Sequence, residues 1–181
     1  GAGDVLFYVL RSTDAGQFIR LYVDRGAINV QSTTEVIGGW FHIAAVRLGT
    51  TGYIYVNGIQ ENSDVGNPNI NNAHNWIIGA AEDGGARLAM GDIADVAIYN
   101  RALTVSEIQA INASEGAWLP KNDIAGYWPM KYSGFSTGQA IANGTTILDT
   151  SGQGQNGTTA DGIDNSMTVE TSPTRSKRGR R

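Results

Sequence analysis

Residues 38–61, GGWFHIAAVRLGTTGYIYVNGIQE, decide the fold. This stretch contains two runs of β-forming residues, WFHIAAVRL at 40–48 and YIYVN at 53–57, with a Gly- and Thr-containing turn between them. Asn57-Gly58 is a strong hairpin signal because both residues accept positive φ, and Ile59 begins the return strand. The stretch therefore predicts consecutive antiparallel strands joined by tight turns.

Short β-forming segments continue on both sides of this stretch. In residues 17–23, the alternation QFIRLYV sets Ile19, Leu21 and Val23 on one face of a strand. The other predicted strands span residues 4–10, 27–31, 75–80 and 92–99. Gly, Asn and Asp lie between these segments, and such short spacing favours a β-sandwich over an α/β fold.

One short helix is predicted after the last of these strands. Thr104 precedes the run VSEIQAIN, and Glu107 stands three residues later, which is the capping-box spacing. Val105, Ile108 and Ile111 share one face at helical spacing. We expect about two turns that pack on the sandwich through this face.

The composition changes after Trp118, where Pro120 interrupts the pattern. Residues 124–130, IAGYWPM, predict one short strand, and Pro129 favours a sheet edge for it. Residues 133–171 are rich in Gly, Ser, Thr, Asn and Asp. We therefore expect a sandwich at 1–118, a loop-rich extension at 119–173 that contributes the YWPM strand, and a basic tail at 174–181.

Two stretches resemble the laminin-G-like, or concanavalin A-like lectin, domain. The first is residues 38–61. The second is residues 91–111, GDIADVAIYNRALTVSEIQAI, which is similar to the closing signature of that family. With IIGAAEDG they lie within residues 38–111, in the family's order. The resemblance implies an all-β, two-sheet antiparallel jelly-roll sandwich with one short helix and a loop-rich C-terminal extension.

The resemblance also implies structural roles for individual residues. Trp40, Ile43 and Ala45 are expected to line the inner faces of the two sheets. Arg101 is expected to pair with an acidic group or a carbonyl beneath the helix. Asp92 and Asp95 lie at the family's short acidic strand motif. We expect these two residues to orient loops, and metal binding is the less favoured role.

Residues 126–158 resemble the opening of the same type of domain, although here they follow its closing signature. The similarity rests on GYWPM and on LDTSGQGQNGT. The segment either begins a second, truncated domain or supplies a strand to this domain or a neighbour. Because its aromatic and aliphatic side chains are costly to leave in water, we expect residues 124–130 to pair with a sheet edge, with Tyr127 and Trp128 as partner contacts.

The net charge of −4 combines an acidic body with a basic tail. The last seven positions hold five of the 13 basic residues, and the remaining 8 face 17 acidic residues, a balance of about −9. These five are Arg175, Lys177, Arg178, Arg180 and Arg181. We expect the tail to contact an acidic protein surface, either virion proteins or copies of this chain, and nucleic acid is the less favoured partner.

The sequence lacks the residues that cysteine-dependent sites, membrane-spanning segments and glycosidase active sites require. The chain has no Cys, and no apolar run approaches the roughly 20 residues that cross a membrane, so no membrane partner is expected. A glycosidase needs two carboxylates on one face, but no Glu-x-Asp-x-x-Glu strand exists. Glu82 and Asp83 are adjacent in a Gly-rich turn, and His42 lies in an apolar strand as a core or edge residue. We therefore expect no enzymatic activity.

Two binding sites are nevertheless compatible with the sequence. A surface glycan could contact His74 and Trp76, together with Glu82 and Asp83 in the following turn. The LDTSGQGQNG loop offers hard oxygen ligands at Asp149, Ser151 and Asn156. Calcium is thus the one candidate cofactor, although most loops of this composition are turns that bind no metal.

Two functions follow from these features. The first is a non-enzymatic structural protein on the virion surface of a bacterial virus, such as a capsid-surface or decoration protein. It rests on the late opening signature and the basic tail, an arrangement similar to virion proteins of tailed bacterial viruses. The alternative is an extracellular carbohydrate-binding or adhesion module of a secreted bacterial protein, for which four Trp and seven Tyr offer sugar-stacking faces.

Overall fold

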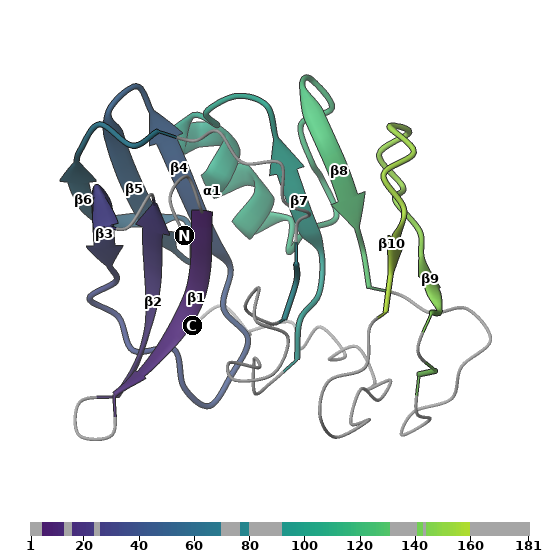
Figure 1. Cartoon of the computed structure of the whole chain (residues 1–181), viewed down its shortest axis with the longest axis horizontal. Helices are drawn as coiled ribbons and strands as arrows, with labels where there is room; N and C mark the ends of the chain where they lie inside the picture. Colours follow the sequence, from purple (N-terminus) through teal and green to yellow (C-terminus); the bar gives the residue numbers. More distant parts are fainter. Residues whose placement is uncertain are drawn as a thin grey trace, which may run out of the picture.

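Two three-stranded antiparallel sheets form the body of the molecule (Figure 1). The computed structural model describes residues 5–12, 16–23, 26–69, 77–79, 92–130, 141–142 and 144–159. The first sheet has the order β1-β2-β3, with β1 at Val5–Ser12, β2 at Gly16–Val23 and β3 at Ile28–Gln31. The second has the order β4-β5-β6, with β4 at Ile43–Leu48, β5 at Thr51–Val56 and β6 at Ile59–Val65. The predicted β-sandwich is thereby confirmed.

The main core lies between these two sheets. Alternate residues of β2 point inward, as predicted, and Ile19, Leu21 and Val23 are each no more than 4% exposed. They meet Ile54 and Val56 from β5 in one cluster, against which Ile43 and Ala45 also pack. The period-two pattern of the sequence thus becomes the dry interior of a two-layer sandwich.

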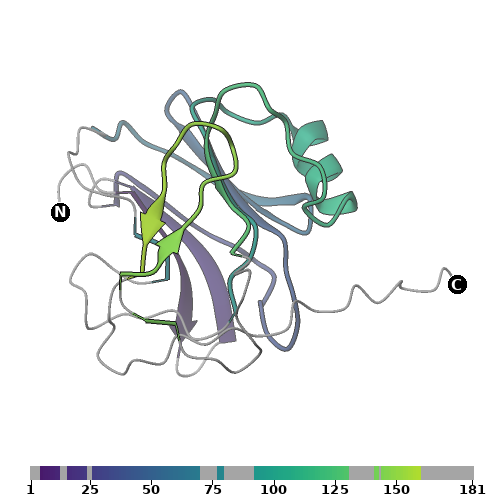
Figure 2. The ribbon, with the colours of Figure 1, turned by 90° about the vertical axis from the view of Figure 1, so that its right-hand side faces the viewer.

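A second apolar cluster covers the outer face of the β4–β6 sheet. The helix α1, Val105–Ala113, packs its fully buried Ile108 against Val46 and Tyr55. Figure 2 shows the helix on the side of this sheet that faces away from β1–β3. The middle sheet therefore has two apolar faces, one toward each layer.

The helix begins as predicted, with a complete capping box. The Thr104 hydroxyl accepts the Glu107 N–H at 3.2 Å, and the Glu107 carboxylate accepts the Thr104 N–H at 2.8 Å. Arg101 donates two hydrogen bonds to the same carboxylate, at 2.8 and 2.6 Å, and one to the Asn122 carbonyl at 3.3 Å. The expected pairing of Arg101 is thus confirmed.

Side chains of β6 close the edge of the opposite sheet. Asp64 Oδ2 accepts the Asn29 N–H at 2.7 Å, and Glu61 Oε2 accepts the N–H groups of Thr33 and Thr34 at 2.7 and 2.9 Å. Burial acts to raise the pKa of Glu61, but these hydrogen bonds outweigh it and the pKa is lowered. The two sheets are therefore joined at this edge by carboxylates, which occupy N–H groups that could otherwise pair with another strand.

The late strand pairs within the chain. β7, Val96–Tyr99, and β8, Ile124–Trp128, form an antiparallel pair in which Ala97 lies opposite Tyr127. The strand covers residues 124–128 of the segment expected at 124–130, and it pairs with β7 in a separate two-stranded sheet. Beyond it, β9 at Thr146–Ile147 and β10 at Gly157–Thr158 form a small hairpin beside β8, on the right of Figure 1.

Some expectations about single residues were wrong. Trp40 lies before β4 and is 48% exposed, and its neighbours Phe41 and Ile43 pack against the core instead. Val105 is 46% exposed, since the helix turns only Ile108 and Ile111 to the core.

The segment expected as a strand at 75–80 is described only at residues 77–79, which form no strand and bend at 78–79. The rest of the segment lies outside the described residues. Among the residues that the structure describes, no helix has the length and apolar character to cross a bilayer.

Candidate functional site

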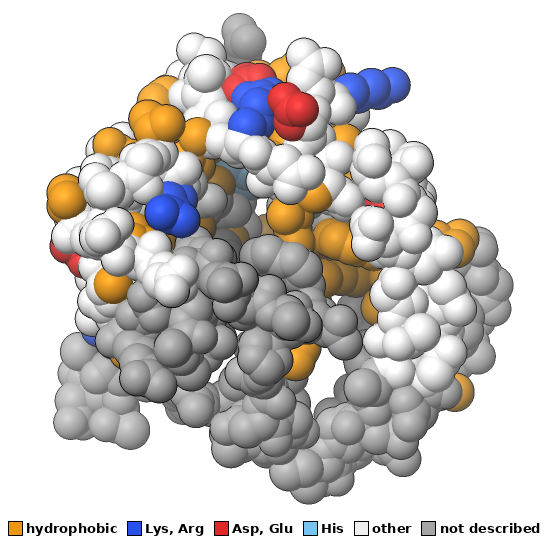
Figure 3. Space-filling model, turned by 45° about the horizontal axis from the view of Figure 1, so that its top comes forward, with side chains coloured by type: hydrophobic (Ala, Val, Ile, Leu, Met, Phe, Trp, Pro, Cys, Tyr) orange, Lys and Arg blue, Asp and Glu red, His pale blue; other side chains and the backbone are white. Residues whose placement is uncertain are grey.

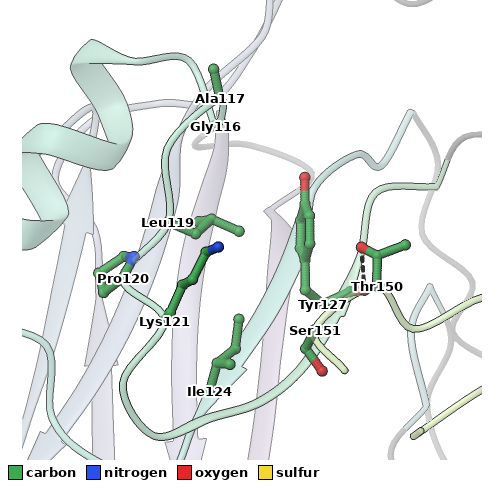
Figure 4. Close-up of a pocket in the computed structure, with 9 residues that line it drawn as sticks. All are labelled: Gly116, Ala117, Leu119, Pro120, Lys121, Ile124, Tyr127, Thr150 and Ser151. Atoms are coloured by element: carbon green, nitrogen blue, oxygen red, sulfur yellow. Dashed lines mark hydrogen bonds between the residues drawn. The ribbon is translucent and has the colours of Figure 1, made fainter. Parts of the chain in front are cut away.

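A pocket of about 320 Å³ opens beside β8. The loop after α1 forms one wall and β8 with the turn after β9 forms the other (Figure 4). The lining residues are Gly116, Ala117, Leu119, Pro120 and Lys121 from the loop, Ile124 and Tyr127 from β8, and Thr150 and Ser151 from the turn. The volume is at the lower end of the range for small-molecule pockets, which is roughly 300–1,000 Å³.

The loop wall is built by the way the helix ends. The Gly116 N–H donates to the Ile111 carbonyl at 3.1 Å, and Gly116 has a φ of +76°, as is common for a glycine that ends a helix. The Ser114 hydroxyl then accepts the Trp118 N–H at 3.1 Å, and Pro120 prevents a further helical turn. These bonds hold residues 116–121 in a fixed curve opposite β8.

Tyr127 is anchored at both ends. Its N–H donates to Asp149 Oδ1 at 2.9 Å, and its hydroxyl donates to Asp95 Oδ1 at 2.7 Å. Asp95 comes just before β7, so the hydroxyl bond also links the two strands of the pair. The ring is therefore held in place before any ligand arrives, which is the condition for binding at low entropic cost.

Behind the pocket, Asp149 organises the turn between β9 and β10. Its Oδ1 accepts the Ser151 N–H at 2.8 Å and its Oδ2 accepts the Gln155 N–H at 2.9 Å. Its own N–H donates to Asn156 Oδ1 at 3.0 Å. Burial acts to raise the pKa of the Asp149 carboxyl, but the donors from Ser151, Tyr127 and Gln155 together hold it well below its usual range.

This network bears on the predicted calcium site. The structure brings Asp149, Ser151 and Asn156 together, as the sequence analysis assumed. Their side-chain oxygens, however, already accept backbone N–H donors, which come from the turn itself and, for Asp149, also from Tyr127. Within the described ranges, no group of three or more His, Cys, Asp or Glu side chains could hold a metal ion. Calcium binding at this turn stays a prediction.

The pocket combines three kinds of binding group. Leu119, Pro120 and Ile124 supply apolar surface, and the exposed Lys121 supplies a positive charge. Thr150 and Ser151 supply hydroxyls, and in Figure 4 the Thr150 hydroxyl is bonded to the Tyr127 carbonyl. Figure 3 shows hydrophobic side chains of described residues in a hollow near the middle of the face that it presents.

Of the other predicted site residues, only Trp128 lies within the described part of the chain. His74, Trp76, Glu82 and Asp83 lie outside the described residues, and so do the five basic residues of the tail. Trp128 is 8% exposed, and its indole N–H donates to the Gln155 carbonyl at 2.8 Å. Its contacts are thus within the chain, which leaves little of the ring for the expected partner contact.

The loop wall of this pocket could not be predicted from the sequence. Gly116 and Pro120 indicate the end of a helix, but nothing in the sequence places residues 116–121 opposite Tyr127. Thr150 was missed as well, because it is one of many hydroxyl residues in a polar segment. Tyr127 was named, although as a contact for a protein partner.

A family model is the comparison with known proteins that agrees with this architecture. No curated protein matches the chain significantly. Among solved structures, the chain matches an S-layer domain-containing protein (residues 221–444) from Clostridium thermocellum ATCC 27405, at 17% identity and a TM-score of 0.39. The match covers 61% of this chain and 64% of that chain. The family model described as concanavalin A-like lectin/glucanases superfamily matches residues 1–109, and the chain therefore belongs to that superfamily.

Proposed function

We propose that this protein is a non-catalytic carbohydrate-binding or adhesion module of a secreted bacterial protein, and that the pocket beside β8 holds the saccharide. The observation that carries the proposal is the Tyr127 ring, which is fixed at its amide and its hydroxyl and forms one wall of the pocket. Membership of a lectin-containing superfamily is consistent with this use.

The pocket has the chemistry that a sugar ring needs. A pyranose presents an apolar C–H face and a rim of hydroxyls, so it fits a site with an aromatic plane and a few polar groups. Tyr127 offers the plane, and Lys121 and the hydroxyl residues of the turn offer the polar groups. The volume of about 320 Å³ suits a small ligand, such as the end of a longer glycan.

Binding without turnover is the simplest use of these groups. Hydrolysis of a glycosidic bond needs a pair of carboxylates on either side of it. Among the described residues that line the pocket there is no Asp or Glu, and the nearby Asp95 and Asp149 already accept hydrogen bonds from the chain. These features support a binding role for the pocket.

A glycan array followed by calorimetry tests the proposal. We expect saturable binding of a subset of glycans by the full chain. Tyr127→Leu should weaken it at least tenfold, because it removes the stacking plane, while Tyr53→Leu, on β5 and away from the pocket, should not. Circular dichroism and thermal melting should first show that both variants are folded. Equal affinity of wild type and a folded Tyr127→Leu would contradict this location for the site.

A structural role on the surface of a bacterial virus is a second proposal. The observation that favours it is the charge distribution, with an acidic body and five basic residues in the last seven positions. A basic tail can bind the acidic body of a neighbouring copy, and such contacts weaken with salt because exposed charges are screened.

Deletion of residues 174–181 tests this second proposal. We expect the full chain to assemble at low salt and to dissociate at high salt, as seen by sedimentation and electron microscopy. The deleted chain should stay monomeric at both. Assembly that is the same with and without the tail would contradict it.

A further inference from the structure

We propose that the saccharide held beside β8 is anionic, and that Lys121 binds its acidic group. The inference rests on the proposed function and names the class of sugar that the same pocket selects. Among the described residues that line the pocket, Lys121 is the one with a charged side chain.

Lys121 is placed to use its charge inside the pocket. Figure 4 shows its side chain extending from the loop wall toward Tyr127, with the ammonium beside Leu119. The residue is exposed, and no hydrogen bond or ion pair of its ammonium occurs within the described part of the chain. The ammonium is therefore available to a ligand that lies against Tyr127.

The nearest carboxylate in sequence is engaged elsewhere. Asp123 lies two residues after Lys121, but its Oδ2 is 3.9 Å from the Arg101 guanidinium. Arg101 is in turn bound in a bidentate manner by Glu107. Arg101, Glu107 and Asp123 thus form a charged cluster at the start of α1. Neither carboxylate of this cluster forms an ion pair with Lys121.

The two carboxylates that anchor Tyr127 also face donors of the chain. Asp149 accepts N–H groups at both of its oxygens, and Asp95 accepts the Tyr127 hydroxyl. Neither carboxylate lines the pocket, and within the described residues no ion pair joins either of them to Lys121. Lys121 is therefore the charged group of the pocket lining with which an anionic ligand can form an ion pair.

The aromatic wall and the cation together specify a shape of ligand. The ligand needs an apolar ring face for Tyr127 and an anionic group at its rim for Lys121. A hexuronic acid and a sulfated hexose both meet this description. Lysine acts as a compact point charge without the fixed fork of arginine, so it accepts either anion.

Matched oligosaccharides test the inference with the full chain. The probes are an oligogalacturonide, the same oligosaccharide after reduction of its carboxyl groups, and a sulfated galactose oligosaccharide of equal length. We expect the acidic probes to bind about two- to fivefold more tightly than the reduced one, which is the upper part of the range for one exposed charge pair. This difference should shrink as the salt concentration rises.

Variants of the lysine separate charge from packing. Lys121→Met should abolish the preference for acidic probes and keep the affinity for the neutral one, while Lys121→Arg should keep both. Arg47→Met is the matched control, because Arg47 is an exposed cation on β4, outside the pocket. It should change neither affinity.

The outcomes distinguish this inference from the proposed function. Equal affinity for neutral and acidic probes overturns the inference and leaves the carbohydrate-binding proposal in place. An equal loss of affinity for both probes in Lys121→Met also overturns it, since the stem and not the charge would then be responsible. If no glycan binds, in the array or among these probes, the proposed function itself fails, and the inference with it.

Discussion

At the scale of single residues, the structure is held by carboxylates that accept N–H and O–H donors. Tyr127 is the clearest case, because Asp149 takes its amide and Asp95 takes its hydroxyl. Both carboxylates lie on other segments than β8, one before β7 and one after β9. A single tyrosine therefore ties three segments of the chain around the pocket.

Replacement of this hydroxyl should cost stability. Tyr127→Phe removes the 2.7 Å hydrogen bond to Asp95, and we expect the free energy of unfolding to fall by about 1.5 kcal/mol. Urea denaturation followed by fluorescence measures it. Tyr53→Phe serves as the control and should change the value by less than about 0.5 kcal/mol. An unchanged stability of Tyr127→Phe would show that the bond contributes nothing.

The carboxylate of Glu107 should make stability depend on pH. Hydrogen bonds from Arg101 and from Thr104 lower its pKa from 4.5 to about 2. A lowered pKa in the folded state means that Glu107 stabilises the fold fully above pH 4.5 and loses this contribution as the pH falls toward 2. Glu107→Gln should therefore lose less stability than wild type between pH 5.5 and pH 2.5.

Thermal melting of both proteins at the two pH values checks this prediction. Other carboxylates titrate in the same range, so the informative quantity is the difference between the two proteins. Equal losses would mean that the charge of Glu107 does not contribute to stability.

At the scale of elements, the β4–β6 sheet is the central layer. It packs β5 side chains against β2 and β3 on one face and against α1 on the other. The short helix is fixed by its capping box at one end and by the buried Ile108 in its middle. Its C-terminal end then sets the course of the loop that forms one wall of the pocket.

The helix gives a matched pair of substitutions. Ile108→Ala leaves a cavity at a residue that is 0% exposed, and we expect it to destabilise the fold by about 2–5 kcal/mol. Val105→Ala, at the exposed start of the same helix, should change the free energy of unfolding by less than about 0.5 kcal/mol. Chemical denaturation measures both, and similar costs for the two would contradict the packing described for α1.

Much of this element structure could be predicted because its causes are local. Asn57 and Gly58 have φ values of 51° and 79°, as the hairpin required, and the capping box of Thr104 and Glu107 formed as the spacing indicated. Exposure could not be predicted in the same way. Trp40 and Val105 are apolar residues in apolar runs, and only the positions of neighbouring elements decide that both face solvent.

At the scale of the whole molecule, the late segment completes the side of the domain that carries the pocket. β8 pairs with β7, and the turn after β9 packs on β8 through the Thr150 N–H, which donates to the Tyr127 carbonyl at 2.8 Å. The pocket thus forms from residues 116–121, β8 and the β9–β10 turn. Such a site depends on long-range packing, which explains why the sequence indicated Tyr127 but not the wall that faces it.

An NMR titration of the isotope-labelled full chain with the tightest glycan from the array would show directly whether this pocket binds a saccharide. We expect saturable amide shift changes centred on residues 116–121, on Tyr127, and on Thr150 and Ser151. Amides of β2, such as that of Leu21, should stay unchanged. Shift changes that map to another part of the molecule, or no change at a saturating glycan concentration, would contradict the claim that this pocket is the binding site.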